Sequence, residues 1–369
     1  MRHAGIILLI SILSMAGIRM TGPEPYVSVY PAYFGNRIDV PIDNPMTVQG
    51  VRLGRMLFYE TALSANHQLS CATCHKQELA FTDGKTFSAG IDGVLQERNT
   101  MSLTNLLWVR NFFWDGRARG LEQQAQTPLT NAHEMGQALS ISVARLQTMS
   151  LYPPLFKAAF GSDTIKEGMI LKALAQFERT LISANSPYDR YLRGLYQPTA
   201  SEAAGIELFY GKGGCGHCHG GPKTYSELYH NNGLDSVSKD PGREKITGQS
   251  YDKGRFRVVT LRNIALTAPY MHDGRFARLE EVIDHYSDHI VSSVTMSPFI
   301  RGNLNLTAVE KKDLLSFLRM LTDSSFITDP QFSNPFRTDR RFVVRRTDIR
   351  YFRETGQISR NPFFGHFKQ

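Results

Sequence analysis

Apolar residues recur along much of the chain at steps of three and four positions, which is the spacing of a helix with one buried face. One such face comprises Ile170, Leu171, Leu174, Phe177 and Leu181. Another follows the capping-box pair Thr307 and Glu310 and comprises Leu314, Phe317, Leu318 and Leu321. Sustained alternation of apolar and polar residues, typical of half-buried strands, is nearly absent. The pattern predicts a mostly α-helical protein with long loops.

The chain also contains an internal repeat. LGRMLFYE lies shortly before Cys71, and AGIELFYGKGG lies directly before Cys215, so the same Leu-Phe-Tyr triplet leads into two pairs of cysteines. A chain of 369 residues is long enough for two cores of ordinary domain size. We therefore expect a first domain at residues 23–190 and a second at residues 191–336, with a linker around residues 185–200.

The two ends of the chain differ in composition from the rest. Basic residues precede an apolar run at residues 5–16, which is shorter than the roughly 20 residues of a membrane-spanning helix. We expect residues 1–22 to be a signal peptide for export to the periplasm, with an uncleaved membrane anchor as the alternative. Residues 337–369 form a basic tail that holds much of the net charge of +8. Because this charge does not line a patterned groove, we expect no nucleic-acid binding.

Only four cysteines occur, in two CxxCH motifs: Cys71, Cys74 and His75, and Cys215, Cys218 and His219. Cysteines of exported proteins often form disulfides, but CxxCH is the attachment pattern of c-type haem. The thiols bind the porphyrin and the His reaches the iron. Since the motifs use every cysteine in repeated surroundings, we expect two cytochrome c-like domains, each wrapping one covalently bound haem c. His75 and His219 are then the proximal iron ligands.

Further motifs resemble those of the bacterial di-haem cytochrome c peroxidase family, and the resemblance covers most of the chain, from about residue 40 to residue 336. Those in the first half are SCATCH (70–75), FTDG (81–84), RNT (98–100), FWDGRA (113–118), EQQA (122–125) and NAHEMG (131–136). Those in the second half are LRNIALTAPYMHDGRF (261–276) and LEEVIDHY (279–286), similar to the segment that wraps the family's second haem. The resemblance implies that the N-terminal haem reacts with peroxide and that the C-terminal haem transfers electrons.

The resemblance also implies roles for three residues. Glu134 is the acid–base residue of the peroxidatic haem, because splitting peroxide needs a group that takes a proton from one oxygen and returns it to the other. Gln124 orients the peroxide, and Trp114 relays electrons between the haems. By residue type alone, Glu134 and Gln124 could be ordinary loop residues and Trp114 a core residue.

The chain departs from the classical peroxidases of this family in the loop after the first CxxCH motif. Those enzymes usually carry a His there, which caps the iron until the other haem is reduced. This chain has no His between Lys76 and Phe113, and residues 87–93 stand in that place. We hypothesise that the first haem has an open sixth position at rest and needs no reductive activation. His133 is the alternative ligand.

The second haem has two candidate ligands opposite His219. Met271 is one, since a thioether ligand raises the potential of a haem. The family's axial Met, however, matches Tyr286 in this chain, and a Tyr there resembles the MauG branch, whose second haem has His and Tyr ligands. We favour Tyr286 and keep Met271 as the alternative.

The resemblance implies further contacts to metal and haem. Asn99, Thr267 and Pro269 match the positions that hold a calcium ion between the domains, and oxygen ligands suit calcium. Arg117 and Arg262 are candidates to bind haem propionates through paired N–H groups.

These features predict a periplasmic di-haem cytochrome c peroxidase that reduces hydrogen peroxide to water. Its electrons would come from a small cytochrome c or cupredoxin through the C-terminal haem, and a homodimer is the family's habit. One alternative is a MauG-like oxidase of a protein substrate, which Tyr286 and the missing loop His favour. The other is a non-enzymatic electron-transfer cytochrome, against which Glu134 and Gln124 argue.

Overall fold

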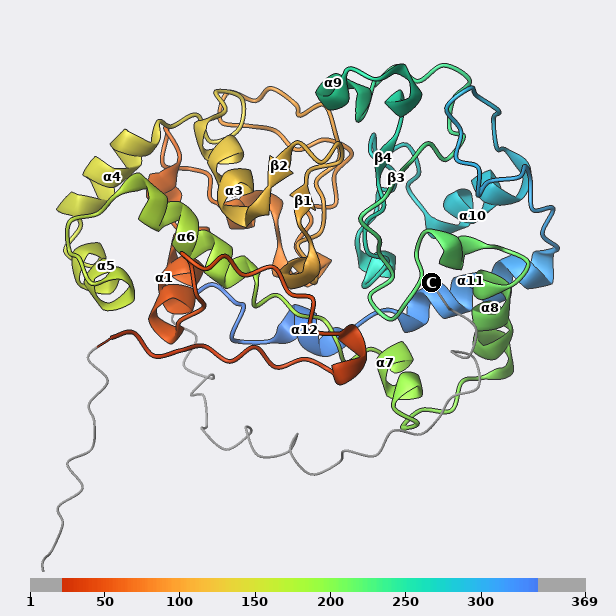
Figure 1. Cartoon of the computed structure of the whole chain (residues 1–369), viewed down its shortest axis with the longest axis horizontal. Coiled ribbons are helices and arrows are strands. Elements are labelled where there is room, and N and C mark those ends of the chain that lie inside the picture. The colour runs from red at the N-terminus through yellow and green to blue at the C-terminus, as the bar shows by residue number, and fades with distance from the viewer. Residues whose placement is uncertain (1–21, 338–369) are drawn as a thin grey trace, which may run out of the picture.

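The computed structural model describes residues 22–337. The predicted signal peptide, apart from its last residue, and the basic tail, apart from its first, lie outside the described residues. Helices joined by long loops make up most of the structure, as predicted (Figure 1). No helix within residues 22–337 is long and apolar enough to cross a membrane.

The helices divide evenly between two halves of the chain. The first half contains α1 (Val48–Phe58), α2 (Cys71–Cys74), α3 (Gly120–Thr130), α4 (Leu139–Thr148), α5 (Tyr152–Phe160) and α6 (Glu167–Glu178). The second half contains α7 (Pro187–Leu192), α8 (Ala200–Tyr210), α9 (Glu244–Thr247), α10 (Leu279–Asp288), α11 (Ala308–Met320) and α12 (Ser324–Thr328). Two short antiparallel strand pairs join β1 (Asn111–Phe112) to β2 (Ala118–Arg119) and β3 (Tyr229–His230) to β4 (Phe256–Arg257).

Both helices predicted from apolar spacing are present. α6 buries Ile170, Leu174 and Phe177. α11 begins after Thr307, whose hydroxyl accepts from the backbone N–H of Glu310 at 3.2 Å, while the Glu310 carboxylate accepts from the Thr307 N–H at 2.8 Å. The capping box therefore starts α11 as predicted.

The internal repeat corresponds to one helix crossing that occurs twice. Gly54 of α1 lies so close to α6 that an added Cβ atom would overlap the carbonyl oxygen of Ala173. Gly205 of α8 lies in the same way against the carbonyl oxygen of Asp313 in α11. Each of these glycines stands three residues before the Leu of its Leu-Phe-Tyr triplet. The repeated sequence thus builds the same close contact in each half.

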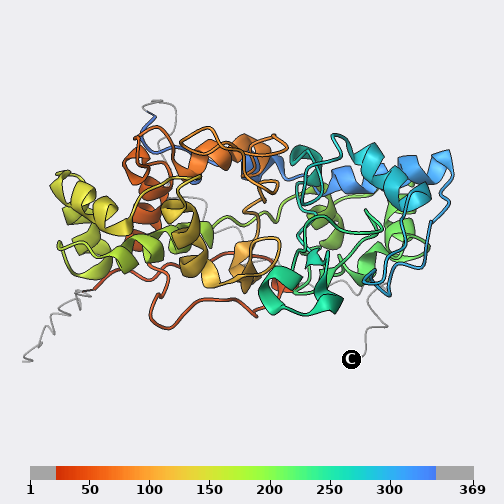
Figure 2. The same ribbon diagram turned by 90° about the horizontal axis from the view of Figure 1, so that it is seen from above.

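The two halves lie side by side (Figure 2), and each contains a hydrophobic core. The last described segment crosses back to the first of them, where Phe326 and Phe332 complete its packing. Arg55 and Tyr59 donate hydrogen bonds of 2.7 Å to carbonyl oxygens within residues 330–333. We call residues 324–337 the terminal strap. Although the strap falls almost entirely within the predicted second domain, it packs on the first core.

A buried ion-pair network joins the two halves near the turn between β1 and β2. Arg98 donates to Asp115 of the first half at 2.6 Å and to Asp240 of the second half at 2.7 Å. The backbone N–H of Arg257 in β4 also donates to the carbonyl oxygen of Trp114 at 2.8 Å. These contacts hold the turn that carries Trp114 against the second half.

Candidate functional site

The first CxxCH motif places its side chains on one short helical turn. Cys71 and Cys74 are the first and last residues of α2, so their thiols lie on the same side of it. The Nδ1 atom of His75 lies 2.8 Å from the carbonyl oxygen of Phe81. Because a carbonyl only accepts, Nδ1 carries the proton and Nε2 keeps its lone pair. Burial lowers the pKa of His75, so its ring stays neutral, as a metal ligand must be.

The second motif repeats this arrangement on a 3₁₀ helix, Cys215–His217. The Nδ1 atom of His219 donates to the carbonyl oxygen of Thr224 at 3.2 Å, which again leaves Nε2 free. Burial lowers the pKa of His219 to about 4. Each half therefore presents the same donor set, two thiols and one neutral imidazole.

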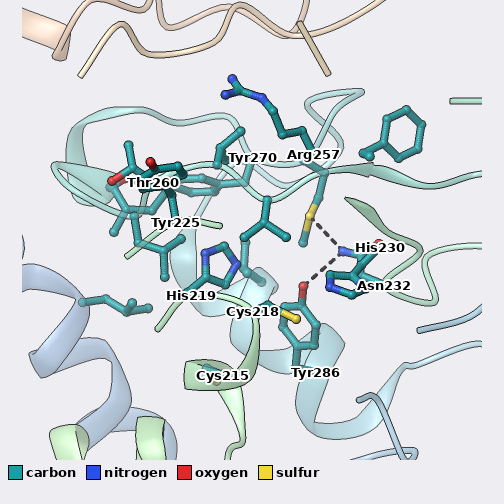
Figure 3. Close-up of a pocket in the computed structure, with 18 of the residues that line it drawn as sticks. Cys215, Cys218, His219, Tyr225, His230, Asn232, Arg257, Thr260, Tyr270 and Tyr286 are labelled. Atoms are coloured by element: carbon teal, nitrogen blue, oxygen red, sulfur yellow. Dashed lines mark hydrogen bonds between the residues drawn. The ribbon is translucent and has the colours of Figure 1, made fainter. Parts of the chain in front are cut away.

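A cavity of about 590 Å³ opens beside the second motif (Figure 3). We call it the second cavity, after the motif that lines it. Both cysteines of the motif, His219 and Arg257 line it. Arg257 is buried, its pKa is lowered by burial, and its Nε atom has no hydrogen-bond partner among the described residues. A buried cation is costly unless an anion accompanies it. A haem c fits these residues, because its vinyl groups, iron and propionates match the thiols, the imidazole and the guanidinium.

The loop after α3 brings Glu134 within electrostatic reach of Cys74. Backbone hydrogen bonds within residues 128–136 fold this loop back onto the end of α3. Burial raises the pKa of the Cys74 thiol, and the charges of Asp83 and Glu134 raise it further. Burial also raises the pKa of Glu134, although a hydrogen bond from Asn131 opposes the rise. The half-buried carboxyl can therefore hold or release a proton beside the haem-attachment point.

Gln124 lies half-buried in the middle of α3. Pro128, one turn later in the same helix, has no N–H to donate to the Gln124 carbonyl. Gln124 and Glu134 thus occupy neighbouring segments, a turn of α3 and the loop that folds back on this helix. Their assignment to the peroxide pocket stays a prediction.

The alternative ligand His133 faces the surface. Its Nδ1 atom pairs with Asp92 at 2.6 Å, and its side chain is 60% exposed. Gly90, in the segment that replaces the family's His loop, packs against the backbone carbonyl of His133. This surface position argues against His133 as an iron ligand, and the open sixth position stays a prediction.

Trp114 lies between the first half and the second cavity. Its indole Nε1 donates to the carbonyl oxygen of Asn99 at 2.8 Å. Its ring meets His272 edge to face, with ring centroids 6.5 Å apart, and it lines the cavity of the second motif. This position suits the electron relay that we predicted.

Tyr286 reaches the second cavity from α10 (Figure 3). Met271, in the loop before α10, lines the same cavity. The amide nitrogen of Asn232 lies 3.1 Å from the Tyr286 hydroxyl and 3.4 Å from the Met271 sulfur. Burial raises the pKa of Tyr286 to about 12, against a lowering effect of the Asn232 hydrogen bond. The structure thus brings both candidate ligands to the same cavity.

Known proteins resemble this chain over most of its length. The profile of the family described as di-haem cytochrome c peroxidase matches residues 48–197. The methylamine utilization protein MauG of Methylophilus methylotrophus is 35% identical over 325 residues, which cover 87% of this chain and 95% of that protein. The chain belongs to the di-haem cytochrome c peroxidase family.

The similar proteins include both MauG-type members and cytochrome c peroxidases of this family. Cytochrome c551 peroxidase of Nitrosomonas europaea is 34% identical over 296 residues, or 79% of this chain and 84% of that protein. A solved structure of a MauG-like protein associated with microbial copper homeostasis has a TM-score of 0.80 and 39% identity. The match covers 85% of this chain and 100% of the chain in the solved structure. The predicted fold and the two haem c sites are thereby confirmed.

The calcium site predicted from the family has less support. Asn99, Thr267 and Pro269 all line the wall of the second cavity. The amide nitrogen of Asn99 donates to the carbonyl oxygen of Lys85 at 2.9 Å. Between residues 22 and 337, no group of three or more His, Cys, Asp or Glu side chains could hold a metal ion. The calcium ion stays a prediction that rests on amide and carbonyl oxygens.

Both candidate propionate ligands have protein partners in this structure. Arg262 is fully buried, and its guanidinium binds Asp189 and the carbonyl oxygen of Pro222. Most of its N–H groups are thus used, and its contact to a propionate stays a prediction. Arg117 pairs with Asp115 at 3.0 Å, and its side chain remains 36% exposed. Its contact to a propionate stays a prediction.

Sequence analysis missed three polar residues beside the haem sites. Two line the second cavity, Arg257 and Asn232. The third, Glu178 of α6, is buried, and its Oε2 atom has no partner among the described residues. Burial raises the pKa of Glu178 to about 8, and its charge helps to raise the pKa of Cys71. The available signal was that Glu178 interrupts the apolar pattern of its helix.

Proposed function

We propose that the protein is a periplasmic di-haem peroxidase that reduces hydrogen peroxide at its first haem site. The observation that carries this proposal is the half-buried carboxyl of Glu134, whose pKa burial raises, close to Cys74. The haem supplies the redox chemistry when bound. Glu134 takes a proton from one oxygen of peroxide and gives it to the other, which leaves as water. Gln124 orients the peroxide through its side-chain amide.

The reaction also needs two electrons and two protons for each peroxide that becomes two molecules of water. We propose that the electrons come from a small cytochrome c or cupredoxin and pass through the second haem site. Trp114 supports this route, since it lines the second cavity and belongs to the turn held between the two halves.

A second candidate function is oxidation of a protein substrate, as in a MauG-like oxidase. Two observations favour it: Tyr286 lies in the second cavity, and no His occurs between residues 76 and 113. In this case peroxide is still the oxidant, but the two electrons are drawn from a partner protein instead of a small carrier.

The first test uses the fully oxidised protein with both haems attached. Its absorption and electron paramagnetic resonance spectra are recorded before and after hydrogen peroxide is added, without prior reduction. We expect one high-spin haem, whose spectrum changes at once with peroxide. Two low-spin haems that do not respond would contradict an open first site.

A second measurement separates the two candidate functions. Reduced small cytochrome c or cupredoxin is added with peroxide, and its oxidation is followed. Rapid turnover supports the peroxidase. A prompt peroxide reaction without turnover of either carrier favours the protein oxidase.

A further inference from the structure

The amide of Asn232 contacts both candidate ligands of the second haem, and Figure 3 shows its contact with the Tyr286 hydroxyl. Its Nδ2 atom is 3.1 Å from the Tyr286 hydroxyl and 3.4 Å from the Met271 sulfur. An Asn amide carries two N–H donors. One side chain can therefore hold both candidate ligands at the same time.

The backbone around Asn232 is fixed to the helix that carries Tyr286. The Nε2 atom of His285, the residue before Tyr286 in α10, donates to the Asn232 carbonyl oxygen at 3.1 Å. The preceding residue, Asn231, is buried and accepts a backbone hydrogen bond of 2.9 Å from Ser297. The amide is thus held in place relative to the phenol.

Met271 is also held toward the cavity by its backbone. Its φ angle is +74°, a region that residues other than Gly rarely adopt. A turn closes over it, in which the Gly274 N–H donates to the Met271 carbonyl oxygen at 3.3 Å. Such a conformation is strained and persists only where the surroundings enforce it. A flexible thioether in this fixed position is a ready second ligand rather than a simple filler.

We propose that Asn232 is a positioning residue that selects Tyr286 as the ligand of the second haem and holds Met271 off the iron. The proposal rests on the haem site described above. An oxygen bound to ferric iron carries negative charge, and a hydrogen bond to a charged oxygen is about twice as strong as one between neutral groups. The N–H contact to sulfur occupies one of its two lone pairs and holds the thioether beside the amide. Without the amide, the preference passes to Met271.

The test compares Asn232→Leu with the unchanged protein, both with haem attached. In the unchanged protein, the second haem shows tyrosine ligation and a low reduction potential. In N232L, we expect the long-wavelength absorption band of thioether ligation and a higher potential, because a Met ligand raises the potential of a haem. An unchanged spectrum and potential in N232L overturns the proposal.

Two further variants identify the new ligand. Met271→Leu alone leaves the ligation of the unchanged protein as it was, and the double variant N232L/M271L loses the thioether band. If M271L alone removes a thioether band, Met271 is already the ligand and the proposal fails, even where N232L does not fold. Haem content and the peroxide reaction of the first site are measured in each variant. If N232L keeps its haem content and its peroxide reaction but shows no change of ligand, the proposal about Asn232 fails and the peroxidase proposal survives.

Discussion

Two carboxyl side chains beside the first haem site have raised pKa values, and their surroundings separate their roles. Glu134 is half-buried, and a hydrogen bond from Asn131 partly opposes the effect of burial. Glu178 is buried, and one of its oxygens has no partner among the described residues. The first can exchange a proton with a small molecule, whereas the second is held neutral in the core.

Replacing Glu134 by Gln tests the proton transfer. Glu134→Gln removes the titratable group with little change in size, and we expect the rate of the peroxide reaction to fall by about 10²–10⁴-fold, the usual contribution of a general acid–base. Stopped-flow absorption measures the rate. Glu97→Gln, at a carboxylate whose side chain is 87% exposed, is the matched control and keeps the full rate. Equal rates in both variants would remove Glu134 from the mechanism.

The pH dependence of the same rate follows from the raised pKa of Glu134. Only the ionised carboxylate can accept the proton of peroxide. Since burial moves the pKa above the ordinary Glu value, we expect the rate to rise with pH through this raised pKa and to be low below it. Stopped-flow measurements over a pH series check this, and the step disappears in E134Q. A step at the ordinary Glu pKa would show that burial does not tune the group.

Glu178 makes the free energy of unfolding fall as pH rises, whereas an ion-paired carboxylate makes it rise. Its pKa is about 8 in the folded protein, against 4.5 without burial, with Arg179 lowering and Glu122 raising it. Between these values the folded state holds a proton that the unfolded state has lost. The free energy of unfolding therefore falls as pH rises, by at most about 1.4 kcal/mol per pH unit.

Glu178→Gln removes this dependence while it keeps the size of the side chain. We expect the variant and the unchanged protein to have similar stability near about pH 5, and the variant to be more stable near about pH 8. Urea unfolding curves of the haem-loaded proteins at several pH values measure the difference. A constant difference across this range would show that Glu178 is ionised in the folded state.

At the level of helices, the close packing of Gly205 in α8 against α11 predicts that an added side chain destabilises the fold. Gly205→Ala pushes a Cβ atom into the backbone of α11, so we expect a loss of about 1–3 kcal/mol or more of unfolding free energy, as for an overpacked core. Gly168→Ala is the control, because this helical Gly has open space around it and the change raises helix propensity. Thermal unfolding of both variants checks the contrast. Equal stabilities would mean that the crossing can relax.

The sequence was sufficient to predict features that depend on residues near one another along the chain. Helical spacing predicted α6 and α11, and the spacing of the cysteines and histidines predicted both haem attachments. Other features depend on residues far apart in the chain. Three examples are the partners of Arg262, the Nε atom of Arg257 that has no partner within residues 22–337, and the position of Asn232 beside two candidate ligands. They arise only when loops fold together. Spacing along the sequence carries no signal for these contacts.

For the whole molecule, the central question is how electrons pass between the halves. Trp114→Phe keeps an aromatic ring but loses the hydrogen bond to Asn99, and we expect slower electron transfer between the haems without a change in either reduction potential. Flash reduction of one haem and observation of the other measures this rate.

The control for Trp114 is the chain's other tryptophan, Trp108, because the sequence contains two. Trp108 is buried in a separate cluster with Phe34 and donates to the carbonyl oxygen of Gly35. Trp108→Phe leaves the rate unchanged, whatever it costs in stability. Equal slowing in both variants would indicate a general loosening of the structure instead of a relay.

The terminal strap has a consequence for the order in which the halves mature. The chain emerges from its N-terminus, so all members of the second core, up to Leu321, are available before Phe326 and Phe332 of the first core. The half that is synthesised first is therefore completed last. As the chain folds, the second haem site can close on its haem while the first still waits for the strap, and a chain cut short before Phe326 would keep one finished half and one unfinished half.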